Sequence, residues 1–227
     1  DIKPSLDSTG NNNAGLTYGG AVSLNTSTTN ANLGTTAGSH FGHYFGGRDD
    51  RIKYDTPDIM GFKLSGSMIQ GNAWDVGLTY GATYGDFQVA AAAAYKELES
   101  NTNSANIGTG LAVKHSSGIS AGGHWSRELT NGSATTLQGH EWGVELGYTT
   151  TAMSNLGATS FNGVYATAYE ASQVQFEANV MGFHVKQSLP AGVDVFASYE
   201  ISEYDDETTS TSIDDVSTAL VGTMISF

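Results

Sequence analysis

The stretch Trp74–Tyr84, WDVGLTYGATY, alternates large apolar or aromatic residues with small or polar ones over its whole length. One set of alternate positions is apolar or aromatic: Trp74, Val76, Leu78, Tyr80, Ala82 and Tyr84. The other set is small or polar: Asp75, Gly77, Thr79, Gly81 and Thr83. Successive side chains of a β-strand point to opposite faces of a sheet, so the stretch predicts a strand with one apolar and one polar face. A segment of about 11 residues also has the length that crosses a bilayer as a tilted strand.

The same alternation recurs along most of the chain. We predict strong strands at Phe87–Glu97, Glu141–Thr150, Asp194–Tyr204 and Ser217–Phe227, and weaker ones at Ala14–Leu24, Arg51–Thr56, Phe62–Ile69, Ile107–His115, Ile119–Glu128 and Thr159–Tyr169. Within Val174–Leu189 the apolar residues change phase, which predicts a β-bulge near Gly182. About 12 or 13 strands result.

The predicted connections alternate between short and long. Short ones are expected at Pro57–Gly61, Gly85–Asp86, Ser116–Gly118, Ala152–Ala158 and Pro190–Val193, and longer polar ones at Asn25–Gly47, Glu99–Asn106, Thr130–Gly139 and Asp205–Val216. Tight periplasmic turns opposite long external loops are typical of outer-membrane barrels. The chain ends on Phe227, an aromatic residue at the end of an amphipathic strand. We interpret Phe227 as part of the assembly signal of a closing strand, at the periplasmic membrane interface.

The composition fits strands with two different faces. Charged residues make up 14% of the 227 residues, with 29 Gly and no Cys, against about 25% charged residues in ordinary soluble domains. No apolar run approaches the roughly 18 residues of a membrane helix. The formal net charge of −14 and the lack of a basic stripe exclude a nucleic-acid partner. Without cysteine, neither a disulfide scaffold nor a thiolate metal site is possible.

Two soluble alternatives, a β-sandwich and a β-helix or fibre, also use alternating strands. A sandwich core would be rich in Leu, Ile and Val, whereas these apolar faces are rich in Ala, Tyr, Phe and Gly. We therefore predict an all-β fold, an antiparallel transmembrane β-barrel in the bacterial outer membrane, with residues 1–227 forming one domain.

Two segments resemble general diffusion porins of Gram-negative bacteria. The segment Gly47–Met68, GRDDRIKYDTPDIMGFKLSGSM, is similar to a family pattern in which an Arg/Asn-rich strand start leads into a Tyr-Asp/Ser-Pro turn, then Gly-Phe and the next strand. Val221–Phe227, VGTMISF, resembles the family's closing strand. Ser188–Tyr199 and Ser8–Leu24 resemble two further hairpins of the family. The resemblance implies a homotrimer of barrels, usually with 16 strands each. Because fewer strands are visible, we expect either an incomplete sequence, with residues missing at the start or around Asn25–Gly47, or a 12-stranded barrel beginning at Ala14.

Charged residues at alternate positions are the candidates for lining and constricting a pore. Arg51 and Lys53 share the polar face of one strand with Asp55, Lys63 lies on the polar face of the next, and Arg48 stands nearby. We predict a ladder of bases there, with Asp49 and Asp50 as counter-charges. The other charges predicted to face the lumen are Lys96, Lys114, Glu141, Glu145, Glu177 and Glu200. Residues at the barrel rim or in trimer contacts are the alternative for the ladder.

The remaining site predictions concern ions and chemistry. The segment with Asp205, Asp206, Glu207, Asp214 and Asp215 could bind a loosely held divalent cation through carboxylate oxygens and bridge lipopolysaccharide. Simple solubility is the alternative for this acidic segment. No other cofactor and no histidine metal site is expected. No catalytic motif is present, so we predict that the protein is not an enzyme.

The sequence predicts passive diffusion of small hydrophilic solutes and ions through a water-filled channel, with a mild preference for cations. Two other functions remain open. A substrate-selective channel would carry a line of aromatics on the polar face, where only Phe196 and Tyr204 occur. A plugged structural or adhesive barrel would carry bulky paired charges inside. Ala91 and Ala93, which are expected to face outward, are the candidates for the trimer surface. Outer-membrane lipid is a further expected partner.

Overall fold

A computed structural model describes residues 23–25, 32–36, 50–97, 104–130, 139–170, 176–206 and 212–225. Its strands are β1 (Ser23–Asn25), β2 (Asn32–Thr36), β3 (Arg51–Asp55), β4 (Phe62–Ile69), β5 (Ala73–Tyr84), β6 (Phe87–Glu97), β7 (Ser104–His115), β8 (Ile119–Thr130), β9 (His140–Thr150), β10 (Thr159–Tyr169), β11 (Phe176–Leu189), β12 (Val193–Asp206) and β13 (Val216–Ile225). Two short 3₁₀ turns are η3 (Gln70–Asn72) and η4 (Pro190–Gly192). Among these residues, no helix is long and apolar enough to span a membrane.

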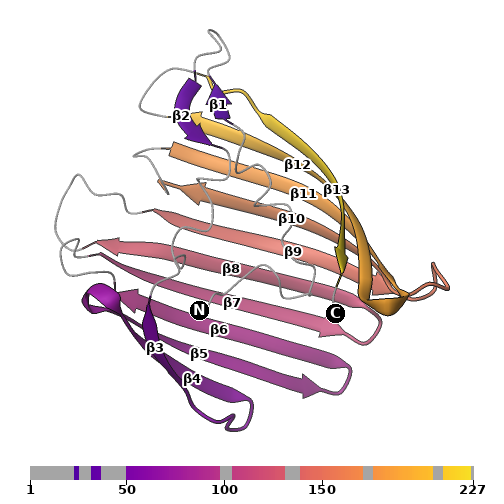
Figure 1. Ribbon diagram of the computed structural model, residues 1–227, viewed down its shortest axis with the longest axis horizontal. Helices are drawn as coiled ribbons and strands as arrows, with labels where there is room; N and C mark the ends of the chain where they lie inside the picture. The colour runs from indigo at the N-terminus through magenta and orange to yellow at the C-terminus, as the bar shows by residue number, and fades with distance from the viewer. Residues whose placement is uncertain are drawn as a thin grey trace.

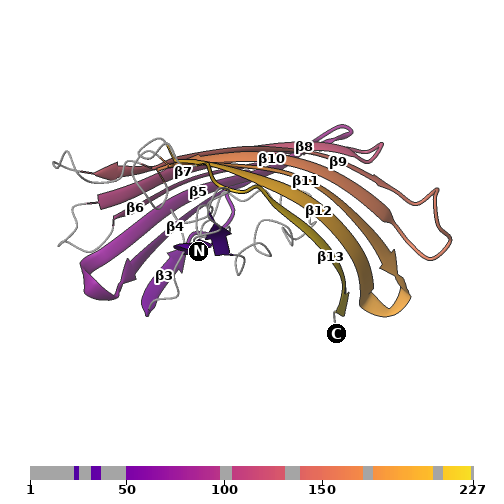
Figure 2. The same ribbon diagram turned by 90° about the horizontal axis from the view of Figure 1, so that it is seen from above.

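The strands from β3 to β13 form one 11-stranded antiparallel sheet in which each strand pairs with its neighbours in sequence (Figure 1). The sheet bows into an arch whose edges are β3 and β13 (Figure 2). β1 and β2 form a separate antiparallel pair. The connection predicted for Asn25–Gly47 therefore contains the strand β2.

Short turns connect the strands at one end of the arch, at residues 56–61, 85–86, 116–118, 151–158 and 190–192. Gly118, in the turn between β7 and β8, has φ +95°, and an added Cβ would lie 1.9 Å from the carbonyl oxygen of Thr149. Glycine is required there because the turn backbone lies directly against β9. The opposite end carries most of the longer connections, as predicted, but also the three-residue η3. The last strand, β13, runs toward the short-turn end.

The two faces of the sheet differ in exposure. Side chains on the concave face shield one another, and alternate residues there are buried, such as Ser65, Ser67 and Ile69 on β4. Side chains on the convex face are large, apolar and exposed, as for Ile52 (81%), Leu146 (69%) and Val221 (77%). We call residues on the concave face inward and those on the convex face outward.

The bulge predicted near Gly182 is wrong. The register between β10 and β11 is continuous from Thr159↔Gln187 to Tyr169↔Glu177, and the pairing of β11 with β12 is equally unbroken. The alternation of inward and outward positions along β11 is therefore unbroken. The apolar residues move from its inward positions to its outward ones.

The reason is an inward apolar cluster at the long-loop end of the sheet. Phe176 and Ala178 on β11 pack there with Tyr204 and Ile213, and all four are buried. The next outward apolar residue, Met181, is 59% exposed. Because Phe176 and Ala178 lie inward, the intervening Glu177 lies outward, which corrects the prediction that it faces the lumen.

Candidate pore-lining face

The basic ladder predicted on the first strands lies on the inward face. Arg51 and Lys53 alternate with outward Ile52 on β3, and Lys63 lies inward on β4. Arg51 Nη1 is 3.1 Å from Asp75 Oδ2 on β5, and Lys53 Nζ is 3.1 Å from Asp55 Oδ1. The sheet therefore brings these bases together with two carboxylates at one edge.

Polar residues that pair across neighbouring strands form a continuous row on the inward face from β3 to β8. Lys53, Ser67, Asp75, Lys96, Asn106 and Glu128 are successive register partners along this row. Ser67 Oγ donates to Asp75 Oδ1 at 2.6 Å. Lys96 is only 7% exposed and lies directly opposite Asp75. Lys114 lies inward on β7, opposite Gln88. These strands bear most of the inward bases.

The inward face from β8 to β12 is acidic. Glu141 and Glu145 both lie inward on β9 and are buried. His124 Nε2 is 3.5 Å from Glu141 Oε1, and Asn162 Nδ2 donates to Glu145 Oε2 at 3.2 Å. His184 Nε2 lies 3.6 Å from Glu200 Oε1.

One base accompanies these acids on the inward face. Lys186 Nζ lies 3.8 Å from Asp194 Oδ2. The concave face therefore separates into a basic side, β3 to β7, and an acidic side, β8 to β12, among the described residues.

The outward face is an apolar band with aromatic residues. All three tryptophans of the chain, Trp74, Trp125 and Trp142, lie outward and are 38–43% exposed. Their neighbours include Tyr95 and Tyr165, with ring centroids 5.2 Å from Trp74 and 5.6 Å from Trp142. An exposed apolar surface of this extent is typical of a membrane interface, where Trp and Tyr are enriched.

Arg127 is the one Lys or Arg that lies outward among the described strand residues. It pairs in register with His140 and stands three residues from the end of β8. This place near the long-loop end is close to the rim of the sheet, where an outward arginine costs little compared with the bilayer midplane.

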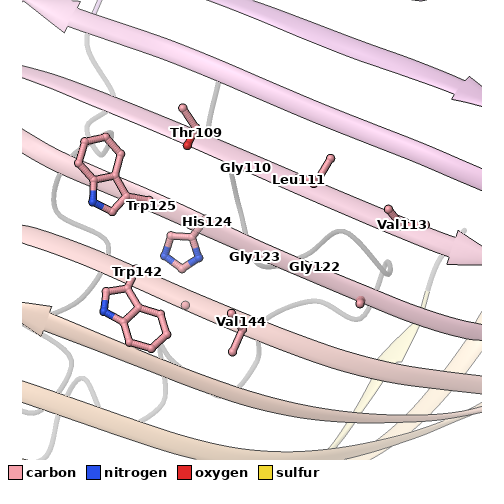
Figure 3. Close-up of a pocket in the computed structure, with 12 residues that line it drawn as sticks. Thr109, Gly110, Leu111, Val113, Gly122, Gly123, His124, Trp125, Trp142 and Val144 are labelled. Atoms are coloured by element: carbon pink, nitrogen blue, oxygen red, sulfur yellow. The ribbon is translucent and has the colours of Figure 1, made fainter.

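A groove of about 510 Å³ crosses the outward surface of β7, β8 and β9 (Figure 3). It forms because Ala121 and Gly123 on β8 are smaller than the residues on either side, such as Leu111 and Val144. Trp125 and Trp142 stand at one end of it (Figure 3). The outward surface is therefore hollowed where small residues meet bulky strands.

The other predicted site residues are only partly described. Arg48, Asp49, Glu207 and Phe227 lie outside the described residues. Asp50 is exposed just before β3, and its carbonyl oxygen accepts a hydrogen bond from Gln70 N at 2.9 Å.

The acidic segment does not form a ligand set within the described residues. Asp205 and Asp206 are consecutive on β12 and so point to opposite faces, and Asp214 and Asp215 are exposed before β13. No group of three potential metal ligands occurs in the part of the chain that the structure describes. A divalent cation there stays a prediction.

Sequence reasoning placed many inward charges but not their partners. The bridge from Arg51 to Asp75 and the pair of His184 with Glu200 join residues on different strands. Alternation gives the face of each residue, whereas the partner depends on register. Asp75 was visible on a polar face, but its neighbour Lys96 follows only from the pairing of β5 with β6.

An antiparallel arch with an apolar, aromatic outer surface and a charged inner surface is the wall of a transmembrane β-barrel. A model of the Gram-negative porin family matches residues 4–207. The chain belongs to this family. It is an outer-membrane channel protein, and the predicted fold class and location are confirmed.

Solved structures agree on the fold. The chain is similar to OmpT of Vibrio cholerae expressed in the outer membrane, with 12% identity, a TM-score of 0.50, and coverage of 79% of this chain and 68% of that one. For the in-vitro folded form of OmpT the identity is 12%, the TM-score 0.54, and the coverage 81% and 69%. For the loop L8 deletion mutant of OmpT the identity is 12% and the TM-score 0.53, with coverage of 88% of this chain and 70% of that one. No curated protein matches significantly.

Proposed function

We propose that this chain lines a water-filled channel for passive diffusion of small hydrophilic solutes and ions. The observation that carries the proposal is the separation of charge on the inward face. Bases such as Lys53 and Lys96 lie on β3 to β7, while acids such as Glu141 and Glu145 lie on β8 to β12. Membership of the porin family favours a channel over an enzyme.

Physical chemistry supports a wet interior. Charges are inexpensive in a water-filled lumen, and opposite charges on facing walls create a field that orders water and disfavours apolar solutes. The chain has 23 acidic and 9 basic residues. Rings of acidic side chains favour cations, so we propose a mild cation preference.

The proposed assembly is a homotrimer. Ala91 and Ala93 lie outward on β6, beside β7 and the groove at Gly123. Small residues allow close approach of a neighbouring barrel, and this supports the predicted trimer surface. Outer-membrane lipid and lipopolysaccharide are the proposed surroundings. A divalent cation held by the acidic segment near Asp214 is a further proposal.

Single-channel conductance in a planar bilayer, with the reversal potential under a salt gradient, tests the diffusion function. We expect stable current steps in groups of three and a reversal potential of the sign that indicates cation preference. If one class of neutral solute reduces the ion current, and the reduction saturates as the solute concentration rises, the substrate-selective alternative would be favoured. Absence of conductance in correctly folded, heat-modifiable protein would contradict the proposal in favour of a plugged barrel.

A further inference from the structure

Four inward polar residues form a continuous group on the acidic side, on β9 to β12. They are Glu145, Asn162, His184 and Glu200, one from each strand. Asn162 donates to Glu145 at 3.2 Å, Asn162 and His184 are register partners, and His184 Nε2 lies 3.6 Å from Glu200 Oε1. We call this group the carboxylate cluster.

Two buried acceptor atoms of the carboxylate cluster make no hydrogen bond, although His184 Nε2 lies 3.6 Å from one of them. Asn162 is 3% and Glu200 5% exposed, and neither Asn162 Oδ1 nor Glu200 Oε1 has a hydrogen-bond partner. A buried acceptor left without a hydrogen bond destabilises the site, and a ligand that donates to it removes that cost. Both atoms accept hydrogen bonds, so the cluster is matched by a ligand that only donates.

The backbone beneath the cluster favours this arrangement. An added Cβ on Gly182 would lie 3.0 Å from Glu200 Cγ, from His184 Nε2 and from Val164 Cγ2. Glycine therefore lets Glu200 and His184 fold down over β11. Glu145, Val164, Gly182 and Glu200 are successive register partners, which places the two glutamate Cα atoms about 14 Å apart at three strand spacings. The sheet is arched across these strands (Figure 2), and both glutamates lie on its inward face.

We propose that the carboxylate cluster binds a small organic dication that carries an ammonium or guanidinium group at each end. These groups donate hydrogen bonds, accept none and remain charged. One end would bind Glu145 and the other Glu200, with Asn162 Oδ1 as a further acceptor. A metal ion fits less well, because no three metal-ligating residues group together within the described residues. Lys186, two residues from His184 on β11, is paired with Asp194.

The proposal rests on the channel function and is tested by current block. The probe is agmatine, which has an ammonium and a guanidinium joined by a short methylene chain, and the matched monocation is butylamine. We expect agmatine to halve the current of the wild-type channel at a concentration roughly tenfold below that of butylamine, because agmatine can form charge-assisted hydrogen bonds at both ends and butylamine at only one.

Three variants locate the site. Glu145→Gln and Glu200→Gln should each raise the half-blocking concentration of agmatine about tenfold and leave that of butylamine nearly unchanged. Glu128→Gln makes the same charge change on the same face near the long-loop end and should leave the agmatine preference intact.

Several outcomes would overturn the proposal. A channel that conducts but is blocked equally by agmatine and butylamine contradicts the site, while the diffusion function stands. The site is also contradicted if Glu128→Gln raises the half-blocking concentration of agmatine as much as Glu200→Gln does. If no current is seen, calorimetric titration of agmatine into the folded protein in detergent decides. If agmatine binds the wild-type protein and Glu200→Gln weakens that binding, the site is supported. If agmatine does not bind, the site is contradicted.

Discussion

The assignment of faces makes a sharp prediction for two adjacent small residues of β12. Ala197 lies outward and exposed, whereas Ser198 lies inward and half-buried. Both stand near the middle of the 14-residue strand, so each faces either lipid or lumen near the bilayer midplane. An arginine at Ala197 should therefore enter hydrocarbon, and an arginine at Ser198 should enter water.

The expected costs differ widely. Ala197→Arg should lower the free energy of unfolding by about 2–4 kcal/mol, which is roughly a 30- to 1,000-fold loss in the folded-to-unfolded ratio. Ser198→Arg should change it by less than about 1 kcal/mol, because the cost of an arginine falls to about 0–1 kcal/mol once its charge is outside the hydrocarbon, and on the lumen face the guanidinium stays in water.

Equilibrium unfolding by urea in lipid vesicles, followed by tryptophan emission, measures both variants. The readout suits this chain because its tryptophans lie on the outward face. Equal costs for the two variants, or a larger cost for Ser198→Arg, would refute the assignment of faces and with it the pore-lining surface.

Three further predictions use other features. Emission from the three tryptophans should be strongly quenched by brominated lipids and little by aqueous acrylamide, and the reverse would place them away from lipid. Gly118→Ala should lower the free energy of unfolding by more than about 1 kcal/mol because of positive φ and the nearby Thr149 carbonyl, whereas Gly81→Ala has open space around its Cβ and should cost little, as urea titration would report. Asp75→Asn should shift the reversal potential toward anions by removing the carboxylate beside Arg51, and an unchanged potential would argue that this pair lies off the ion path.

Alternation in the sequence was sufficient to place most strands and faces. Phe62–Ile69, Phe87–Glu97 and Thr159–Tyr169 begin and end where predicted, because lipid on one side and water on the other impose a strict period of two. The face of Lys96 and of Glu145 followed from the same rule.

The rule failed where the inner face is itself apolar. Phe176 and Ala178 belong to an inward cluster with Tyr204, so an apolar stripe there does not mark lipid. The phase change at Gly182 was consequently misread as a bulge, and Glu177 was assigned to the wrong face. Contacts between strands, such as Arg51 with Asp75, depend on register, which a single strand's pattern does not contain.

Cysteine accessibility tests the water-filled lumen most directly, because the chain has no native cysteine. Thr218→Cys and Ala219→Cys place a thiol inward and outward at adjacent positions of β13. With a charged, membrane-impermeant thiol reagent added during conductance recording, the account predicts that the current of Thr218→Cys falls irreversibly while that of Ala219→Cys is unchanged. The account would be contradicted if the reagent reduced the current of Ala219→Cys alone, or of neither variant. Either result would argue against a water-filled path along the concave face.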